Sequence, residues 1–373
     1  MKSNKPHLLI VTNLYPLPWE PNRATFNRQQ FAQLKDSYSV SILVPVAFPE
    51  WWRHRKEIEN TDNLRFIPRL YLPKLGRRLY ALMMWWSLRW FAGRWTKRNA
   101  PDKVFASWAY PDAVAARKLA KWLKCPFYFK VHGSDINMHG AVPARARQIT
   151  AAANDARAIL SVSQALKHVM LNMGIEQKKV HTIYNGVDHD LFSQETRPPT
   201  DSPYVLFVGN LKHDKGVMEL LRGFEQISAL YPDLTLYYAG DGPMRASLES
   251  YCKNSTTLAA NVTFLGQINH NALPAWMQHT RCLALPSYNE GVPNVVLEAM
   301  SCGQPILATK VGGIPEVVPD YCGVLIAPRS HEEVATGLRQ VLDTSWNSEQ
   351  IKRHASQYNW KRNREQLLQL LSL

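Results

Sequence analysis

Short apolar runs alternate with helix-like segments from one end of this chain to the other. One of the helix-like segments is PDAVAARKLAKWLK, residues 111–124. Short continuous apolar runs between helices are typical of parallel strands buried on both faces, so the pattern predicts an α/β fold. The runs are HLLIVTN, VSILVPV, LRFIPRL, KVFASW, PFYFKVHG, AILSVS and KVHTIYN in the first half, then YVLFVGN, LTLYYAG, VTFLGQI, RCLALPS, PILATK and GVLIAP in the second.

The length of the chain predicts two domains. Its 373 residues exceed what one hydrophobic core usually supports. The polar, proline-rich segment ETRPPTDSP is typical of a linker. We therefore expect doubly wound, Rossmann-like domains over residues 1–195 and 204–355, joined by residues 196–203. Sheets of this kind bind ligands at the carboxyl ends of their strands, so we expect these ends to face a central cleft.

Composition is that of an ordinary globular protein, with 46% apolar and 20% charged residues. No run of about 18 uncharged apolar residues appears, so we expect no membrane-spanning helix. The N-terminal stretch lacks the apolar core and cleavage pattern of a secretion signal, and we expect a cytoplasmic protein. The five cysteines are odd in number and lack C-x-x-C spacing, which argues against a disulfide framework and a structural zinc site.

The net charge of +14 is unevenly distributed. Residues 51–100 hold twelve Lys or Arg against three acids, and six of the twelve tryptophans. Within them, residues 77–98 have helical spacing, basic ends and many aromatic side chains. Such a helix can lie on an anionic membrane surface, or it can be a crossover helix packed on a sheet with a solvated basic edge. Nucleic acid is a third partner for basic and aromatic patches, but no nucleic-acid-binding motif accompanies this one, and we expect none to bind.

The stretch EGVPNVVLE carries two carboxylates, Glu290 and Glu298. Proline is favoured in the first turn of a helix, so Pro293 places Glu290 in the preceding loop and Glu298 about a turn and a half inside. The free N–H groups and positive end of such a helix form an anion site. We therefore expect an elongated ligand with an anionic middle and a hydroxyl-rich group at each end. The residues between the two acids are Gly291, Val292, Pro293, Asn294 and Val295.

Turns after the strands of the second half carry further candidate ligand contacts. Lys215 lies in the loop that follows Gly209, where its ammonium group can reach an anion. Glycines in such turns let backbone approach a ligand closely, although a G-D-G sequence alone is a common turn. The other candidates in these turns are Gly240, Asp241, Gly242 and Gly266. Neither a Walker A loop nor the G-x-G-x-x-G of a nicotinamide-dependent oxidoreductase is present.

Taken together, these motifs resemble the retaining glycosyltransferases of family 4, which have the GT-B fold. In the second half the matching pieces are GNLKHDKG, AGDGP, VTFLGQ, EGVPNVVLE, GQPILATKVGGIPEVV and YNWKRN. In the first half they are SWAYPDAVAARKLAK, KVHGSDI and TIYNGVDHDLF. The resemblance therefore covers nearly the whole chain. It also implies that a C-terminal helix, residues 356–373, packs back on the first domain.

The resemblance implies a role for each matching residue. Glu290 would contact the hydroxyls of the donor sugar, Glu298 those of the ribose, and Lys215 the diphosphate. His132 would face the donor sugar from the first domain. On residue type alone, a local contact with a backbone carbonyl is the favoured interpretation. Asp135, in the same HGSD motif, would lie on the acceptor side.

Two departures from the family pattern stand out. Asn210 occupies a position where the family often has Arg, which leaves Lys215 and the helix N-terminus as the main counter-charges. The loop PNRATFNRQQF resembles the acceptor-side loop of the family, but Ala24 stands where glycine is usual. Arg23 and Arg28 in this loop can reach a phosphate, and a solvated loop is the alternative.

We therefore expect a retaining glycosyltransferase that moves a sugar from a nucleotide-diphosphate sugar to a hydroxyl of a glycan or lipid-linked acceptor. A UDP-sugar is the first expectation for the donor and GDP-mannose the second. We expect no permanently bound cofactor and no required metal, and a role in surface polysaccharide assembly at the inner face of the plasma membrane. The alternatives are a nucleotide-sugar epimerase or hydrolase of the same fold, and a non-catalytic protein that binds carbohydrate or a membrane surface.

Overall fold

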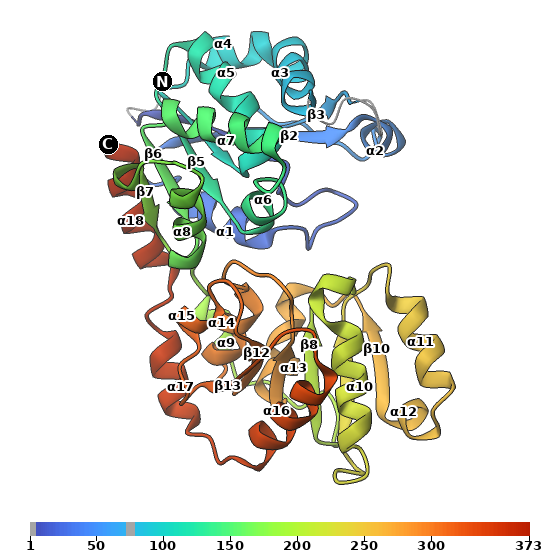
Figure 1. The fold of residues 1–373 in the computed structure, drawn as a ribbon. Coiled ribbons are helices and arrows are strands. Elements are labelled where there is room, and N and C mark those ends of the chain that lie inside the picture. The colour runs from blue at the N-terminus through green and yellow to red at the C-terminus, as the bar shows by residue number, and fades with distance from the viewer. Residues whose placement is uncertain (1–4, 72–78) are drawn as a thin grey trace. The chain divides into compact units, whose positions relative to one another are not determined.

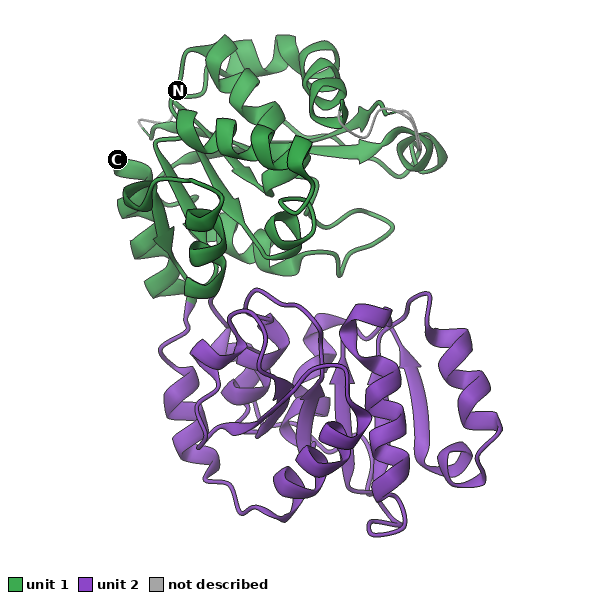
Figure 2. Cartoon of the chain, viewed as in Figure 1, with its two compact units in different colours: residues 1–185, 360–373 green, residues 186–359 purple. Residues whose placement is uncertain are grey.

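The computed structural model describes residues 5–71 and 79–373. The chain forms two compact units (Figure 2). Unit 1 runs to Asn185 and also contains Trp360–Leu373, and unit 2 is Gly186–Asn359.

Unit 1 is built on a parallel sheet of seven strands in the order β3-β2-β1-β4-β5-β6-β7. Its central strands are buried along almost their whole length, as the continuous apolar runs require. The strands are β1 His7–Val11, β2 Ser39–Ala47, β3 Leu64–Arg69, β4 Lys103–Ser107, β5 Phe127–Val131, β6 Ala158–Ser161 and β7 Val180–Thr182.

Helices cover both faces of this sheet (Figure 1). On one face α3 Tyr80–Phe91, α5 Val114–Leu123 and α7 Pro143–Asp155 pack side by side. On the other, α1 Thr25–Gln33 packs against the C-terminal helix α18 Trp360–Ser372. The remaining elements are α2 Phe48–Arg53, α4 Gly93–Asn99, the π-helical turn η1 Ala109–Ala113, α6 Ser134–Asn137, α8 Gln164–Asn172 and the 3₁₀ turn η2 Gln177–Lys179.

Unit 2 repeats this architecture with a parallel sheet of six strands in the order β10-β9-β8-β11-β12-β13. The strands are β8 Tyr204–Val208, β9 Thr235–Ala239, β10 Val262–Gly266, β11 Cys282–Leu285, β12 Ile306–Thr309 and β13 Gly323–Ile326. Helices α10 Val217–Ile227 and α16 His331–Asp343 pack together. Helix α14 Asn294–Ser301 packs with α9 His189–Ser193, α13 Leu273–Gln278 and α17 Ser348–Ala355. The others are η3 His213–Lys215, α11 Arg245–Lys253, α12 Thr256–Asn261, η4 His270–Ala272 and α15 Ile314–Val317.

Every predicted strand-like run corresponds to one strand, and both sheets are parallel, so the predicted α/β class with two doubly wound units is confirmed. The units divide at Asn185, whereas the sequence predicts the linker at residues 196–203. The short helix α9 lies between these points and packs on α13 and α14 of unit 2. Helix α18 begins at Trp360 and lies in unit 1.

Within the basic, tryptophan-rich segment 77–98, residues 77 and 78 lie outside the described residues. Helix α3 buries Ala81, Met84 and Leu88 against β3 and α5, which is the arrangement of a crossover helix. Its opposite side exposes aromatic rings, with Trp86 45% and Trp90 64% exposed. Among residues 5–71 and 79–373, no helix combines the length and apolar character needed to cross a membrane.

Candidate functional site

In unit 2, the loops that follow neighbouring strands come together at the carboxyl edge of the sheet. The turn η3 follows β8, and the loop from Pro286 to Pro293 follows β11. A backbone hydrogen bond of 2.8 Å from Tyr288 N–H to the Asp214 carbonyl joins the two loops. The rings of His213 and Tyr288 meet edge to face, with centroids 5.3 Å apart. These contacts bring Lys215 next to Glu290.

Lys215 and Glu290 form an ion pair in which Nζ lies 2.5 Å from Oε1. The Glu290 side chain is 11% exposed and that of Lys215 27%, so the pair sits in a partly buried position. Ionised groups that bond to each other make short, strong hydrogen bonds. Both side chains keep some exposed surface where the loops after β8 and β11 meet, so a ligand that carries an anionic group and a hydroxyl group can reach them.

The second acid, Glu298, lies in α14, which begins at Asn294. Pro293 is the N-cap residue of this helix, because its ψ of 126° is extended rather than helical. The sequence predicts Pro293 in the first turn, so the helix begins one residue later than predicted. Glu290 precedes the helix and Glu298 lies about one turn after its first residue. Glu298 is buried, and its Oε1 lies 3.1 Å from Nε2 of His270.

The contact between Glu298 and His270 was not predicted. His270 lies in η4, after β10, and its ring packs edge to face on Phe192 with centroids 5.6 Å apart. The strand that ends at Gly266 predicts a loop at the carboxyl edge of the sheet, and His270 follows closely in that loop. That position is the signal that identifies this histidine as a candidate.

The glycine turns after β8, β9 and β10 pack on one another. A Cβ atom at Gly240, where φ is 152°, would lie 1.8 Å from the Gly209 carbonyl oxygen. Gly240 is also bridged to Gly266, and a Cβ atom at Gly242 would lie 2.5 Å from Oδ1 of Asn210. The Leu211 N–H donates to the Asp241 carbonyl at 2.9 Å. At Gly240 and Gly242 the chain itself therefore fills the space where a side chain would lie, whereas at Gly209 and Gly266 an added Cβ atom would meet no atom closer than 3.5 Å. The contact of these glycines with a donor remains a prediction.

The loop that follows β12 contacts the backbone at Glu290 and Gly291. The Gly313 N–H donates to the Gly291 carbonyl at 2.7 Å. A Cβ atom at Gly312, whose φ is 54°, would lie 1.9 Å from the Glu290 carbonyl oxygen. Only glycine fits at Gly312 without moving the Glu290 backbone.

In unit 1, His132 follows β5 and belongs to a buried polar cluster. Its Nε2 lies 2.9 Å from the Ser107 hydroxyl, which in turn donates to Oδ1 of Asn27 at 3.1 Å. Its ring packs on those of Phe26 and Trp108, at centroid distances of 5.3 and 5.9 Å. The hydrogen bond of His132 is thus to a hydroxyl group on the neighbouring strand, not to the local backbone carbonyl considered above.

Asp135 holds the loop around His132 in place. One carboxylate oxygen accepts hydrogen bonds from the backbone N–H groups of His132 and Gly133, both at 2.9 Å. The other accepts one from the Ala109 N–H at 2.8 Å. Asp135 is fully buried. This geometry gives Asp135 a positioning role, and the predicted acceptor contact remains a prediction.

Burial sets the electrostatics of this cluster. Burial and then the charge of Lys130 lower the pKa of His132 well below its usual value, so the ring is neutral. Burial also lowers the pKa of Lys130 to about 7. Its ammonium group donates to Oε1 of Gln30 at 2.9 Å and to Oδ1 of Asn185 at 2.8 Å.

Of the stretch PNRATFNRQQF, which resembles an acceptor-side loop, only residues 21–24 precede α1; residues 25–31, Arg28 among them, belong to the helix. Arg23 donates to the Asn13 carbonyl at 3.1 Å and pairs with Glu20 at 3.2 Å, and Arg28 is exposed. Ala24 has φ 47° and ψ 44°, the left-handed conformation that favours glycine.

A buried carboxyl group lies behind this loop. The Asn13 side chain donates to Asp112 at 3.0 Å. Burial raises the pKa of Asp112 to about 7. Asp112 belongs to the motif SWAYPDAVAARKLAK, but no individual role was predicted for it from the sequence.

The structure thus describes two clusters, each on the carboxyl edge of its own sheet. Unit 2 pairs Lys215 with Glu290, and Glu298 of α14 with His270, and unit 1 brings together His132 and Asp135. Within the described ranges, no group of three or more His, Cys, Asp or Glu residues is arranged to hold a metal ion. All five cysteines are free, and all but Cys125 are buried.

Comparisons with known proteins match both halves of the chain. The family model described as Glycosyl transferases group 1 matches residues 188–361, and the one described as Glycosyltransferase Family 4 matches residues 32–191. The Bacillus subtilis (strain 168) glycosyltransferase TuaC, provisionally assigned to teichuronic acid biosynthesis, is 25% identical over 371 residues, which cover 92% of this chain and 90% of TuaC. A glycogen synthase of Mycobacterium tuberculosis (strain ATCC 25618 / H37Rv) is 27% identical over 267 residues, which cover 69% of this chain and 64% of the glycogen synthase.

Two solved structures have a similar fold. Anabaena Alr3699/HepE in complex with UDP aligns with a TM-score of 0.73 and 20% identity, covering 98% of this chain and 99% of its own. Sucrose-phosphate synthase from Thermosynechococcus elongatus aligns with a TM-score of 0.76 and 19% identity, covering 98% of both chains. The fold is therefore GT-B. With both halves matched by glycosyltransferase models, the chain belongs to the glycosyltransferases of family 4 and is a glycosyltransferase enzyme.

Proposed function

We propose that this enzyme transfers a sugar from a UDP-sugar to a hydroxyl group of a glycan or lipid-linked acceptor, with retention of configuration at the anomeric carbon. The observation that carries the proposal is the Lys215–Glu290 ion pair beside the start of α14, with Glu298 about one turn into that helix. The structurally similar HepE was solved with UDP and with UDP-glucose, which supports the choice of donor.

The donor would bind along the start of α14. Its diphosphate takes the N-terminus of the helix, where N–H groups and the helix dipole favour negative charge by about 0.3–2 kcal/mol. Lys215 then exchanges Glu290 for a phosphate oxygen. Glu290 is released to accept hydrogen bonds from the hydroxyls of the donor sugar, and Glu298 accepts those of the ribose. His270, 3.1 Å from Glu298, holds that carboxylate in position.

The chemistry of transfer explains why these charges are needed. As the glycosidic bond breaks, positive charge develops at the anomeric carbon and the leaving diphosphate becomes more negative. Donors that already point at the diphosphate stabilise this state without reorganisation. With retention, the acceptor hydroxyl attacks from the face that the diphosphate leaves, and a phosphate oxygen takes its proton. The proposed reaction uses no metal.

In unit 1, we propose that His132 contacts the donor sugar as a neutral hydrogen-bonding group. Its ring is fixed by Ser107 and by the Asp135 carboxylate that holds its backbone. Arg23 and Arg28 are proposed to contact a phosphate of the acceptor. The side chain of Arg28 is exposed and that of Arg23 is partly so.

The acceptor would be part of a surface polysaccharide, which the provisional assignment of TuaC to teichuronic acid biosynthesis supports. We propose that the enzyme is cytoplasmic and meets lipid-linked acceptors at the inner face of the plasma membrane. The outer side of α3 and α4 supports a membrane contact, because it exposes the apolar side chains of Leu82, Trp86, Trp90 and Phe91 together with basic side chains. The exposed basic residues are Arg94 and Arg98, together with Arg89 and Lys97, whose charged groups lie over the Trp122 ring of α5.

Vesicle flotation tests the membrane contact. The wild type should float with vesicles that contain phosphatidylglycerol and remain behind with phosphatidylcholine alone, since the attraction is electrostatic and apolar together. The double variant Trp86→Ser/Trp90→Ser should lose most of this binding. Leu230→Ser, which changes a side chain that is 62% exposed in unit 2, is the control. Equal flotation of wild type and double variant would remove α3 from the contact.

Product analysis tests the reaction itself. Purified enzyme is incubated with UDP-sugars or with GDP-mannose, with and without a lipid-linked glycan acceptor, and the anomeric configuration of the product is read by NMR. Transfer that depends on the acceptor is expected, at a rate that Glu290→Gln lowers about a hundredfold or more. An altered sugar nucleotide without acceptor would indicate an epimerase or hydrolase. Unchanged transfer by Glu290→Gln would reject its role.

A further inference from the structure

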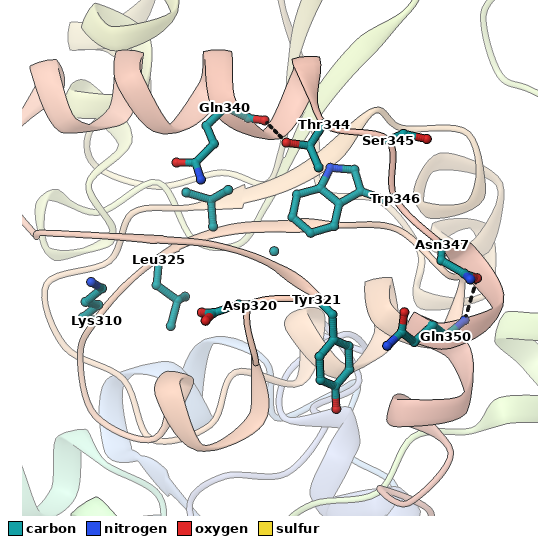
Figure 3. A pocket seen from close by; sticks show the side chains of 12 residues that line it. Lys310, Asp320, Tyr321, Leu325, Gln340, Thr344, Ser345, Trp346, Asn347 and Gln350 are labelled. Atoms are coloured by element: carbon teal, nitrogen blue, oxygen red, sulfur yellow. Dashed lines mark hydrogen bonds between the residues drawn. The ribbon is translucent and has the colours of Figure 1, made fainter.

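Beside the edge strand β13, unit 2 carries a pocket of about 610 Å³ (Figure 3). This volume lies within the range of about 300–1,000 Å³ that is usual for small-molecule sites. Its walls come from β13, the end of α16, the segment from Thr344 to Asn347 and the start of α17. None of the residues assigned above to donor or acceptor binding lines it.

Two aromatic rings lie on opposite sides of this pocket, Trp346 on one and Tyr321 on the other (Figure 3). Each ring is held by a hydrogen bond at its polar end. The Trp346 indole N–H donates to the Val341 carbonyl at 2.8 Å, and the Tyr321 hydroxyl lies 3.0 Å from Nδ1 of His354. Tyr321 is nonetheless 44% exposed. Rings that are fixed before a ligand arrives lose little conformational freedom when it binds.

The polar lining combines carboxamide and hydroxyl groups with charges that balance. Side chains that project from three segments supply the amides of Gln340, Asn347 and Gln350 (Figure 3). Lys310 and Asp320 are the only ionised groups among the lining residues, one of each sign. The pocket therefore has no net charge with which to attract a phosphate or a polyanion.

We propose that this pocket binds a neutral oligosaccharide, separately from the donor site of unit 2. A sugar ring presents a face of C–H groups, which packs on an aromatic face, and a rim of hydroxyls that both donate and accept hydrogen bonds. Carboxamides match that rim, because each offers an acceptor oxygen and two N–H donors in one plane. The two fixed rings and the three carboxamides supply both kinds of contact in one pocket, although Oδ1 of Asn347 already accepts a hydrogen bond from the Gln350 backbone N–H at 3.0 Å.

An extended peptide is the competing occupant, because an edge strand can accept a further strand. Peptides that add a strand place alternate side chains in apolar pockets. Here the walls opposite β13 are instead amides, hydroxyls and ring faces. A second glycan site would go beyond the proposed transfer reaction: it would hold the growing product on the enzyme between additions.

Titration with neutral oligosaccharides tests the proposal on the full-length enzyme. The probes are the pentasaccharides of maltose, cellulose, laminarin, mannan and chitin, followed by tryptophan fluorescence and calorimetry in saturating UDP, which occupies the donor site. At least one probe should bind with millimolar or tighter affinity while UDP is present. UDP binding is measured separately, so loss of glycan binding alone leaves the proposed reaction standing.

Variants locate the binding. Trp346→Ala should weaken glycan binding about tenfold or more, and Gln340→Ala, which keeps the backbone carbonyl that Thr344 uses, about threefold. If Trp346→Ala unfolds, Tyr321→Ala, at an exposed position, replaces it. Leu230→Ala should leave binding unchanged. The proposal is overturned if no probe binds, or if the ring and Gln340 variants bind like the wild type. It is also overturned if the enzyme instead binds an extended peptide and these variants abolish that binding, which would assign the pocket to a peptide.

Discussion

Lys215 and Glu290 meet as an ion pair although 75 residues separate them in the chain. Both lie in loops rather than in long helices or strands, and backbone contacts between those loops set the distance between their charges. Removing the two charges of a partly buried pair from water costs free energy, and an ion pair on the open surface does not have this cost. The place of the Lys215–Glu290 pair beside a helix N-terminus makes an exchange of partners with a phosphate the simplest function for it.

Lys215→Ala should raise the dissociation constant of UDP about tenfold to a hundredfold, because a charge-assisted hydrogen bond to phosphate is lost. Lys212→Ala, in the same loop with an exposed side chain, is the matched control and should change the constant little. Calorimetry with UDP measures both. Equal affinity of the Lys215 variant and the wild type would reject the counter-charge role of Lys215.

His132 predicts a pH dependence with a definite sign. Because its pKa in the folded enzyme is lowered well below the usual value of 6.5, the ring stays neutral as the pH falls through 6.5. The unfolded chain takes up the proton there, so His132 makes the enzyme less stable, not more, below that pH. The pH profiles of kcat/KM should therefore have the same shape near pH 6.5 in the wild type and in His132→Gln. An ionisation near pH 6.5 that is present in the wild type and absent from the variant would contradict a neutral, buried ring.

Ala24 adopts a left-handed conformation that costs a non-glycine residue about 1–2 kcal/mol. Ala24→Gly should therefore raise the free energy of unfolding by about 1 kcal/mol, less what glycine adds to the entropy of the unfolded chain. Ala32→Gly is the control, because Ala32 lies within helix α1 and the same change there should lower it by a similar amount. Denaturant midpoints at constant m measure both. A lower midpoint for Ala24→Gly would contradict the backbone argument.

At the scale of elements, the start of α14 depends on the loop after β12. A side chain at Gly312 would lie 1.9 Å from the Glu290 carbonyl oxygen, so Gly312→Ala must move the Glu290 backbone. We expect UDP-sugar turnover to fall about tenfold or more while the fold is retained. Gly174→Ala is the control, since its φ of 84° is also positive but nothing lies within 4 Å of the added atom. Equal turnover of the two variants would show that Gly312 does not support Glu290.

Local periodicity predicted the elements well but not every contact between them. Each strand was visible because its apolar run is continuous, and the candidate residues at strand ends followed from parallel topology. The partner of Glu298 was not visible, because His270 is 28 residues away and belongs to a loop without a motif. At Gly240 a carbonyl oxygen of the chain itself occupies the position of a side chain, which no local pattern shows, and the contact of this turn with a donor stays a prediction.

At the scale of the molecule, the C-terminal helix joins unit 1 through a buried polar network. Gln30 donates to Oδ1 of Asn363 at 2.8 Å, and Asn363 donates to the Tyr184 carbonyl at 2.6 Å. The Lys130 ammonium bonds to Gln30 and to Asn185, the last residue before the division between the units. The sequence predicts the division about ten residues later, at a proline-rich segment, because composition reveals flexible linkers. Composition does not reveal with which of the two units a short helix such as α9 packs.

We propose that the donor diphosphate binds at the start of α14, between two acidic side chains. A crystal structure of the enzyme with UDP tests it most directly. We predict the diphosphate against the backbone N–H groups of Asn294 and Val295, with Lys215 within hydrogen-bond distance of it and Glu298 on the ribose hydroxyls. A UDP molecule bound elsewhere, or a Glu298 side chain that makes no contact with the ribose, would contradict it.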